Sequence, residues 1–180
     1  MRTAIVVFAT LVAISASAAQ ASNWSMAAAS CVPGDPAIQN NLHFITAGTV
    51  AHKTGATGRI TLYCPITGTW GDKNPTWLSI TYALKINAAP AQPGQGATIT
   101  AQVIRLTQSD GTLATIGNPV SVRTGQTVPI RGKASSPSFS HNFDFKNSFY
   151  YVRVDIDRND PGSAATLYGV GLHCPTCLAN

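Results

Sequence analysis

The sequence predicts an all-β protein: an antiparallel β-sandwich, jelly-roll-like, with a short helical turn near the N-terminus. Segments with alternating apolar and polar side chains recur between residues 43 and 173, and clusters of Gly, Pro, Asn and Asp separate them. No amphipathic helical pattern of ten residues occurs. Charged residues make up 11% of the chain, well below the usual value of about 25%, which argues against long charged helices. An immunoglobulin-like sandwich is the alternative, but the Cys and Trp spacing of that family is not evident.

The first 21 residues have the anatomy of a secretory signal peptide. Arg2 supplies a positive charge, residues 4–14 form an apolar run, and small residues up to Ala21 offer cleavage sites. The run is too short for a membrane span of about 20 residues, and no later stretch comes close. We therefore expect an exported protein, secreted or periplasmic, without a transmembrane segment.

Cleavage after Ala21 leaves about 159 residues, which suits one domain. Residues 22–42 are expected to be an irregular N-terminal segment. Within it, Asp35 is a suitable N-cap and Pro36 a suitable first helical residue, so residues 35–39 predict the short helical turn. Residues 43–180 are then the sandwich domain.

Strands are expected wherever the side chains alternate. The expected ranges are 58–64, 77–86, 97–106, 112–116, 120–128, 139–145, 149–158 and 164–173. The range 77–86 has the clearest period of two. In 97–106 the phase slips at Val103 and Ile104, which predicts a bulge. The segment Ser109-Asp110-Gly111-Thr112 predicts a hairpin turn.

The four cysteines all follow the signal segment, and an even number in an exported chain predicts two disulfides. The favoured pairing joins Cys64 to one thiol of the Cys174–Cys177 pair and Cys31 to the other. The alternative is a Cys31–Cys64 bond with a local Cys174–Cys177 bond. The CxxC spacing is also that of redox sites, but too few residues follow it for the helix that would activate a thiol, so a structural role is favoured.

The net charge is +5, and the sequence contains seven Asp and no Glu. The twelve Lys and Arg residues are spread along the chain rather than clustered. Because nucleic-acid binding requires a denser basic stripe, nucleic acid is excluded as a partner.

Acidic and amide side chains gather late in the chain. Asp155 and Asp157 share one face of the expected strand, and Asn159 and Asp160 lie in the turn beyond it. Oxygen ligands at such spacing are what calcium uses, so these four residues are the candidate metal site, although the EF-hand pattern is not met. The plainer interpretation is a solvated face on which Arg153 balances Asp155. No other cofactor is indicated.

Two tryptophans flank a polar loop. Trp70 and Trp77, with Asp72 and Asn74 between them, predict a sugar-stacking site in which rings contact the apolar face of a pyranose and polar groups bind its hydroxyls. The alternative places Trp77 in the core and Trp70 over one end of the sandwich.

No catalytic residue is predicted. The motifs GxSxG, HExxH and the phosphate-binding loops are absent. His141 falls on the apolar face of 139–145, where a hydrogen-bonded core or rim histidine is the plainer interpretation. A hydrolase would require His141, Asp144, Asp155 and Asp157 to converge in one pocket.

The signal segment, the N-terminal cysteine and the strands "ITLYCP" and "YYVRVDIDR" resemble small, uncharacterised exported bacterial β-sandwich proteins. The resemblance implies no activity and no catalytic residue. The expected function is therefore a non-catalytic exported binding or surface-structural protein, with carbohydrate or another surface protein as its partner. A secreted hydrolase and a protein-interaction or assembly subunit are the alternatives.

Overall fold

The computed structural model describes residues 21–36, 43–67, 74–85, 96–125 and 131–178. Over these residues the chain forms eleven strands and one 3-10 helix, Ala28–Ser30. The strands are β1 (Ala21–Ala27), β2 (Val32–Pro33), β3 (His43–Thr46), β4 (Thr49–His52), β5 (Gly58–Pro65), β6 (Trp77–Lys85), β7 (Ala97–Thr107), β8 (Leu113–Arg123), β9 (Arg131–Ser135), β10 (Ser148–Arg158) and β11 (Ala164–Leu178). In this part of the chain no helix is long and apolar enough to cross a membrane.

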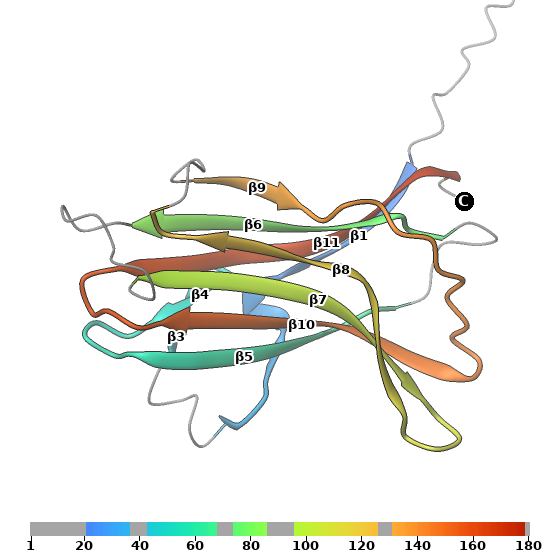
Figure 1. The fold of residues 1–180 in the computed structure, drawn as a ribbon, viewed down its shortest axis with the longest axis horizontal. Helices are drawn as coiled ribbons and strands as arrows, with labels where there is room; N and C mark the ends of the chain where they lie inside the picture. Colours follow the sequence, from blue (N-terminus) through green and yellow to red (C-terminus); the bar gives the residue numbers. More distant parts are fainter. Residues whose placement is uncertain (1–20, 37–42, 68–73, 86–95, 126–130, 179–180) are drawn as a thin grey trace, which may run out of the picture.

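The strands form two antiparallel sheets, with the long strands running along the length of the molecule (Figure 1). One sheet has the order β3–β4–β11–β6–β9, and β1 also pairs with β11, on the side that β4 uses. The other sheet has the order β2–β5–β10–β7–β8. We call these the β11 sheet and the β10 sheet.

The strand pairing confirms the jelly-roll-like sandwich. The pairs β7–β8, β6–β9, β5–β10 and β4–β11 are nested, as if one long hairpin had been rolled up. Rolling a hairpin in this way produces two sheets whose strands alternate along the chain, which defines a jelly roll. The first and last strands of the described chain, β1 and β11, are therefore neighbours.

Alternating side chains explain which face of each sheet is buried. Along β5 and β10 every second residue faces the other sheet and is buried. Burial of each aliphatic side chain stabilises the folded state by about 1.5–3 kcal/mol, which favours this orientation of the strands. The fully buried residues between the sheets include Ile60, Leu62, Leu78, Ile80, Tyr82, Ile99, Val103, Val122, Ile156, Leu167 and Leu172. The intervening residues form the outer face of the sheet, and this face carries the candidate site.

The first residues of the N-terminal segment form a strand and are not irregular, contrary to the prediction for this part. Residues 21–27 form β1, which pairs with β11 and places Trp24 in the core at 7% exposure. Close approach of the two backbones depends on Gly169, since a Cβ there would lie 2.7 Å from the carbonyl oxygen of Met26. Most of the helical turn expected over residues 35–39 and of the signal segment over 1–21 lies outside the described residues.

The strand expected over 139–145 is also wrong. Its side chains alternate in burial, but its backbone joins neither sheet. Instead the backbone N–H of Phe139 donates to the carbonyl of Thr76, and the N–H of Phe143 donates to the side chain of Asn74. The alternation thus reflects an extended segment laid across one end of the sandwich.

The expected strands 112–116 and 120–128 merge into the single strand β8. The β7–β8 register shifts between Ala101 and Val103, next to the predicted bulge. Ala101 pairs with Val120 and Val103 pairs with Ile116, so the unpaired extra residues belong to β8, around Gly117, and not to β7. Gly117 has φ +65°, and the side chain of Gln102 donates to the carbonyls of Ile116 and Gly117. The polar strand β9 was not predicted, because it lacks apolar alternation.

The favoured disulfide pairing is wrong, and the alternative is right in its first bond. Cys31 and Cys64 form a disulfide, which joins the segment before β2 to the core-facing side of β5. Cys174 is disulfide-bonded as well.

Candidate functional site

Aromatic side chains gather on the outer face of the β10 sheet, where β5 ends beside the start of β10. Tyr63 and Pro65 project outward from β5, while Phe149 and Tyr151 project outward from β10. Tyr151 lies opposite Pro65 in the β5–β10 register. Phe149 is 60% exposed, an unusual degree of exposure for a phenylalanine in a strand. We call these four residues the aromatic patch.

The two tyrosines of the patch are held in place by their neighbours. Their ring centroids lie 5.4 Å apart, and the ring planes are almost perpendicular, at 89°. Edge-to-face pairs of this kind are a favoured aromatic geometry. Tyr63 also packs against Gly34, where a Cβ would lie only 3.1 Å from the ring carbon Cε2. Burial and the neighbouring Tyr63 raise the pKa of Tyr151, so its hydroxyl stays protonated as a hydrogen-bond donor.

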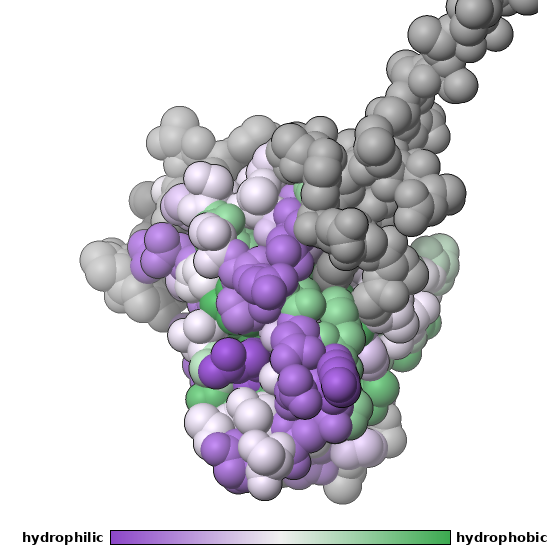
Figure 2. All heavy atoms as spheres, turned by 90° about the vertical axis from the view of Figure 1, so that its right-hand side faces the viewer, coloured by the Kyte–Doolittle hydropathy of each residue, from purple (hydrophilic) through white to green (hydrophobic). Residues whose placement is uncertain are grey.

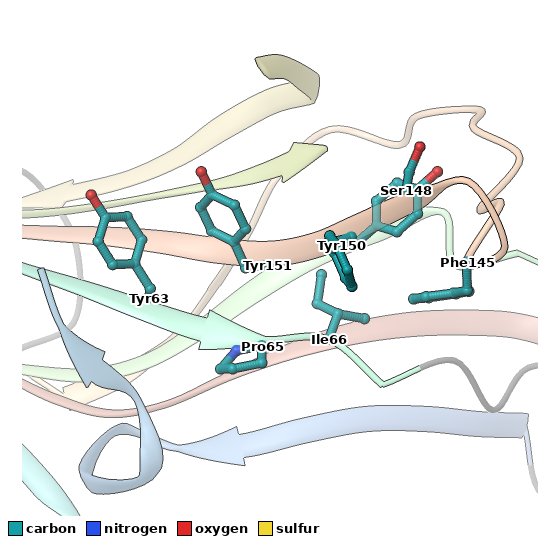
Figure 3. Close-up of a pocket in the computed structure, with 8 residues that line it drawn as sticks. Tyr63, Pro65, Ile66, Phe145, Ser148, Tyr150 and Tyr151 are labelled. Carbon is teal, nitrogen blue, oxygen red and sulfur yellow. The ribbon is translucent and has the colours of Figure 1, made fainter. Parts of the chain in front are cut away.

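A cavity of about 410 Å³ adjoins the patch and curves around the end of β5. Figure 3 shows Tyr63 and Tyr151 side by side on one side of the strands, with Ile66, Tyr150 and Phe145 beyond the strand end. The residues that line the cavity are Tyr63, Pro65, Ile66, Phe145, Ser148, Phe149, Tyr150 and Tyr151. The lining is mostly aromatic and aliphatic, as in many small-molecule sites.

The inner wall of this cavity is rigid because its rings contact one another. The ring of Tyr150 lies 4.7 Å from that of Phe143 and 5.0 Å from that of Phe145, centroid to centroid. The Tyr150 hydroxyl accepts a hydrogen bond from the backbone N–H of Asp144 and lies 3.3 Å from Nε2 of His141. Burial lowers the pKa of His141, and the nearby Arg105 lowers it further. A neutral His141 can therefore accept a hydrogen bond from the Tyr150 hydroxyl through Nε2.

Polar side chains continue the outer face away from the patch. Arg153 lies opposite Tyr63 and forms an ion pair with Asp155 at 3.1 Å. The hydroxyl of Thr61 donates to Asp155 at 2.7 Å, and Arg59 pairs with Asp157 at 2.7 Å. Aromatic rings and hydrogen-bonding groups thus share one sheet face.

This end of the sandwich also has a mixed surface. Figure 2 shows a hydrophilic band down the end of the molecule, with hydrophobic surface beside it. The aromatic patch and the cavity lie where β5 ends and β10 starts, at the same end as the extended segment 136–147 (Figure 1).

The four candidate calcium ligands have other partners. Asp155 binds Thr61 and Arg153, and Asp157 binds Arg59. Asp160 accepts hydrogen bonds from the N–H of Gly162 and the hydroxyl of Ser163, and these bonds lower its pKa. Asn159 lies beyond the end of β10, and its backbone N–H donates to the carbonyl of Gly96. Among the described residues, no three His, Cys, Asp or Glu side chains are grouped as a metal site. Calcium binding stays a prediction.

The predicted sugar-binding loop is only partly described, since Trp70 and Asp72 lie outside the described residues. Trp77 is half-buried on the β11 sheet and stacks on His173, with ring centroids 5.6 Å apart. Asn74 lines a separate cavity of about 220 Å³ together with His141 and Asn142, and its side chain donates to Asn142. Neither residue belongs to the aromatic patch.

The residues proposed for a hydrolase do not converge. His141 contacts the inward-facing Tyr150, whereas Asp155 and Asp157 project from the outer face. Five residues of strand separate Tyr150 from Asp155, which corresponds to about 17 Å. Asp144 accepts hydrogen bonds from the side chain and backbone of Asn147 and from the N–H of Lys146; these bonds lower its pKa and fix the turn before β10.

Sequence reasoning missed the aromatic patch, although a signal was present. Tyr63, Phe149 and Tyr151 fall on the polar side of two alternating strands, where large rings are out of place. The register that brings the two strands together is not visible in the sequence.

No protein-family model and no curated protein matches this sequence. Among solved structures, the chain is similar to a xylan-binding module, CBM15, with 12% identity and a TM-score of 0.47 over 86% of this chain and 97% of that one. It is similar to the CBM36-1 domain of a multidomain xylanase from the hindgut metagenome of Trinervitermes trinervoides, with 7% identity and a TM-score of 0.44 over 85% and 98%. It also matches 36% of a family two carbohydrate esterase from Cellvibrio japonicus, with 14% identity and a TM-score of 0.42 over 89% of this chain. Likeness at this level carries no argument about what the chain binds.

Proposed function

We propose that this chain is a non-catalytic, exported carbohydrate-binding protein whose ligand lies along the outer face of the β10 sheet. One observation carries the proposal: the half-buried rings of Tyr63 and Tyr151 and the exposed ring of Phe149, on two neighbouring strands, adjoin a row of hydrogen-bonding side chains. The apolar face of a pyranose stacks on one ring of the patch at a time, because the planes of Tyr63 and Tyr151 are perpendicular, and Arg153 and Asp155 lie farther along the same face to bind its hydroxyls. Same-face residues on a strand are about 7 Å apart, so Phe149, Tyr151 and Arg153 form a row along β10.

The rigidity of the patch favours this role. Tyr63 packs against Gly34, and the rings of Tyr63 and Tyr151 pack against each other. Because these side chains are already ordered, ligand binding costs little side-chain entropy. Export agrees with the signal segment and with the Cys31–Cys64 disulfide, because disulfides persist in oxidising compartments. The predicted location is the periplasm or the medium.

Affinity electrophoresis through gels that contain soluble polysaccharides tests the proposal. The panel is xylan, mannan, mixed-linkage β-glucan, hydroxyethyl cellulose and pectin. We expect at least one polysaccharide to retard the protein, Tyr151→Ala to abolish the retardation, and Ile45→Ala to leave it intact. Ile45 is a matched control because it is 52% exposed on β3 of the other sheet. Equal mobility of the wild type in every gel would contradict the proposal.

A second candidate is a protein-interaction or assembly subunit. Leu113, at the start of β8, is 62% exposed and lies on the same sheet as Phe149. Both lie opposite Leu106 in the strand registers, so the three apolar side chains form a row across the sheet, and a contiguous apolar surface favours association. Light scattering coupled to gel filtration tests this role: a dimer that dissociates in Phe149→Ala supports it, and a monomer at millimolar concentration excludes self-assembly.

A further inference from the structure

We propose that the cavity beside the aromatic patch binds an aryl group carried by the ligand, such as an aromatic acyl ester on a sugar. This inference rests on the proposed function, because the sugar part of the ligand is placed on Tyr63 and Tyr151. It adds a second subsite with different chemistry and names the class of substituted carbohydrate that the protein selects.

The lining of the cavity favours an apolar group over a sugar ring. Apart from Ser148, its inner walls are rings and aliphatic side chains; the hydroxyl of Tyr150 is already bonded to Asp144 N–H and His141, and those of Tyr63 and Tyr151 belong to the outer part. A pyranose carries hydroxyls on most of its carbons. Placed in this cavity, it would leave several of them without partners, which is unfavourable for any buried polar group.

The size and shape of the cavity fit a substituted aromatic ring. An apolar cavity of about 150 Å³ is large enough to hold benzene, and the whole cavity of about 410 Å³, which includes the part over Tyr63 and Tyr151, has room for such a ring at its inner end beside Ile66 and Phe145. Phe145 and Tyr150 present their rings from the inner side, with centroids 5.0 Å apart. An inserted ring can therefore make aromatic contacts with this wall.

The position of the cavity allows one ligand to occupy both subsites. The cavity curves around the end of β5 and reaches from the outer Tyr63 and Tyr151 to Ile66 and Phe145, which Figure 3 shows beyond the end of the strand. A sugar stacked on Tyr151 projects its substituents past Pro65 into the space lined by Ile66 and Phe145. An ester or glycosidic linkage of a few atoms spans this corner.

Saturation-transfer NMR and calorimetry with methyl ferulate, an uncharged aromatic ester without a sugar, test the cavity alone. We expect saturation of the ring protons and binding that weakens at least fivefold in Phe145→Ala. Ile66→Phe, which fills the cavity, should abolish binding. Ile45→Ala should leave it unchanged. Circular dichroism and melting temperature establish that each variant is folded, and Phe145→Ala alone decides the test if Ile66→Phe does not fold.

The outcomes separate the two proposals. Absence of ring saturation, or equal affinity in a folded Phe145→Ala, overturns the aryl subsite even if a polysaccharide retards the protein in gels. Binding of methyl ferulate that is weaker in Phe145→Ala supports the subsite. If the subsite is supported but no polysaccharide retards the protein in gels, only the proposed carbohydrate-binding function is contradicted. An aryl-substituted oligosaccharide that binds tenfold more tightly than its saponified form supports both.

Discussion

Tyr63 and Tyr151 meet edge to face, with ring centroids 5.4 Å apart, on the outer surface of two paired strands. The contact depends on the β5–β10 register, which places Tyr151 opposite Pro65 and Tyr63 opposite Arg153. The two tyrosines are therefore diagonal neighbours, and diagonal contacts lie within reach of aromatic side chains. The arrangement produces an ordered ring surface before any ligand arrives.

Gly34→Ala tests how far binding depends on this order. The new methyl group would lie 3.1 Å from Cε2 of Tyr63 and 3.3 Å from Cγ2 of Thr61, so the tyrosine ring must move. We expect severalfold weaker binding of the retained polysaccharide in calorimetry, with a loss of unfolding free energy of about 1 kcal/mol. Tyr63→Phe is the control, because it keeps the ring in place. Unchanged affinity in Gly34→Ala would show that the position of Tyr63 is unimportant.

Gly117→Ala should be far more damaging than Gly111→Ala. Both glycines have positive φ, +65° and +69°, so alanine at either costs about 1–2 kcal/mol of backbone strain. At Gly117 the added Cβ also lies 2.6 Å from a ring carbon of Phe139, whereas nothing lies within 4 Å at Gly111. We expect an additional loss of about 1–3 kcal/mol at Gly117 in urea denaturation. Equal losses would mean that Phe139 moves away freely.

Local alternation predicted most of the sandwich but not the elements that depend on distant partners. The strands β5, β6, β7 and β10 follow from alternating side chains, and their observed bounds differ from the expected ranges by one residue or less. Residues 139–145 alternate equally well, yet this segment crosses one end of the sandwich and pairs with neither sheet. Conversely, β1 and β9 lack a clear pattern and form because β11 and β6 offer them a free edge.

Removal of the Cys31–Cys64 disulfide tests its contribution to stability. The bond closes a loop with a sequence separation of 33, for which the chain-entropy model gives about 3–4 kcal/mol. The double variant Cys31→Ala and Cys64→Ala should lose about that much unfolding free energy. Urea denaturation of both proteins under non-reducing conditions measures the difference. A loss below about 1 kcal/mol would indicate that strand pairing alone holds the N-terminal segment in place.

Acid should destabilise the fold through buried histidines. The pKa of His52 lies below 6.5, and burial of the ring is the largest cause. The nearby Arg158 and His43 lower this pKa as well. The hydrogen bond to the Gly58 carbonyl and the charge of Asp157 raise it, but they do not reverse the direction. The unfolded chain therefore takes up the proton first as the pH falls. Stability is complete above about pH 6.5 and is lost as the pH falls towards the lower folded pKa.

The variant His52→Gln isolates this contribution. His141 and His173 also have pKa values lowered by burial, so the wild type should lose stability below about pH 6.5 through several groups. Urea denaturation from pH 5 to pH 8 should show a smaller loss in His52→Gln than in the wild type. Parallel pH profiles for the two proteins would exclude His52 as a source of the acid sensitivity.

The candidate site was less predictable than the fold, for a physical reason. Alternation shows that Tyr63 and Tyr151 face outward, but it does not show that they are neighbours. Their contact requires the pairing of two strands that are distant in the sequence, and a shift of register by two residues would separate the rings. The tryptophans near residue 70 are conspicuous in the sequence, yet Trp77 packs on His173 of the other sheet.

The most direct test of carbohydrate binding by the aromatic patch is an NMR titration of the isotope-labelled protein with an oligosaccharide of the retained polysaccharide. If the proposal is correct, the largest amide shifts fall on Tyr63 and on residues 149–153, and they vanish in the Tyr63→Ala/Tyr151→Ala variant. Shifts centred on Asn74, Trp77 and His173, with the patch unperturbed, would contradict the proposal and would favour the loop between Trp70 and Trp77 as the binding site.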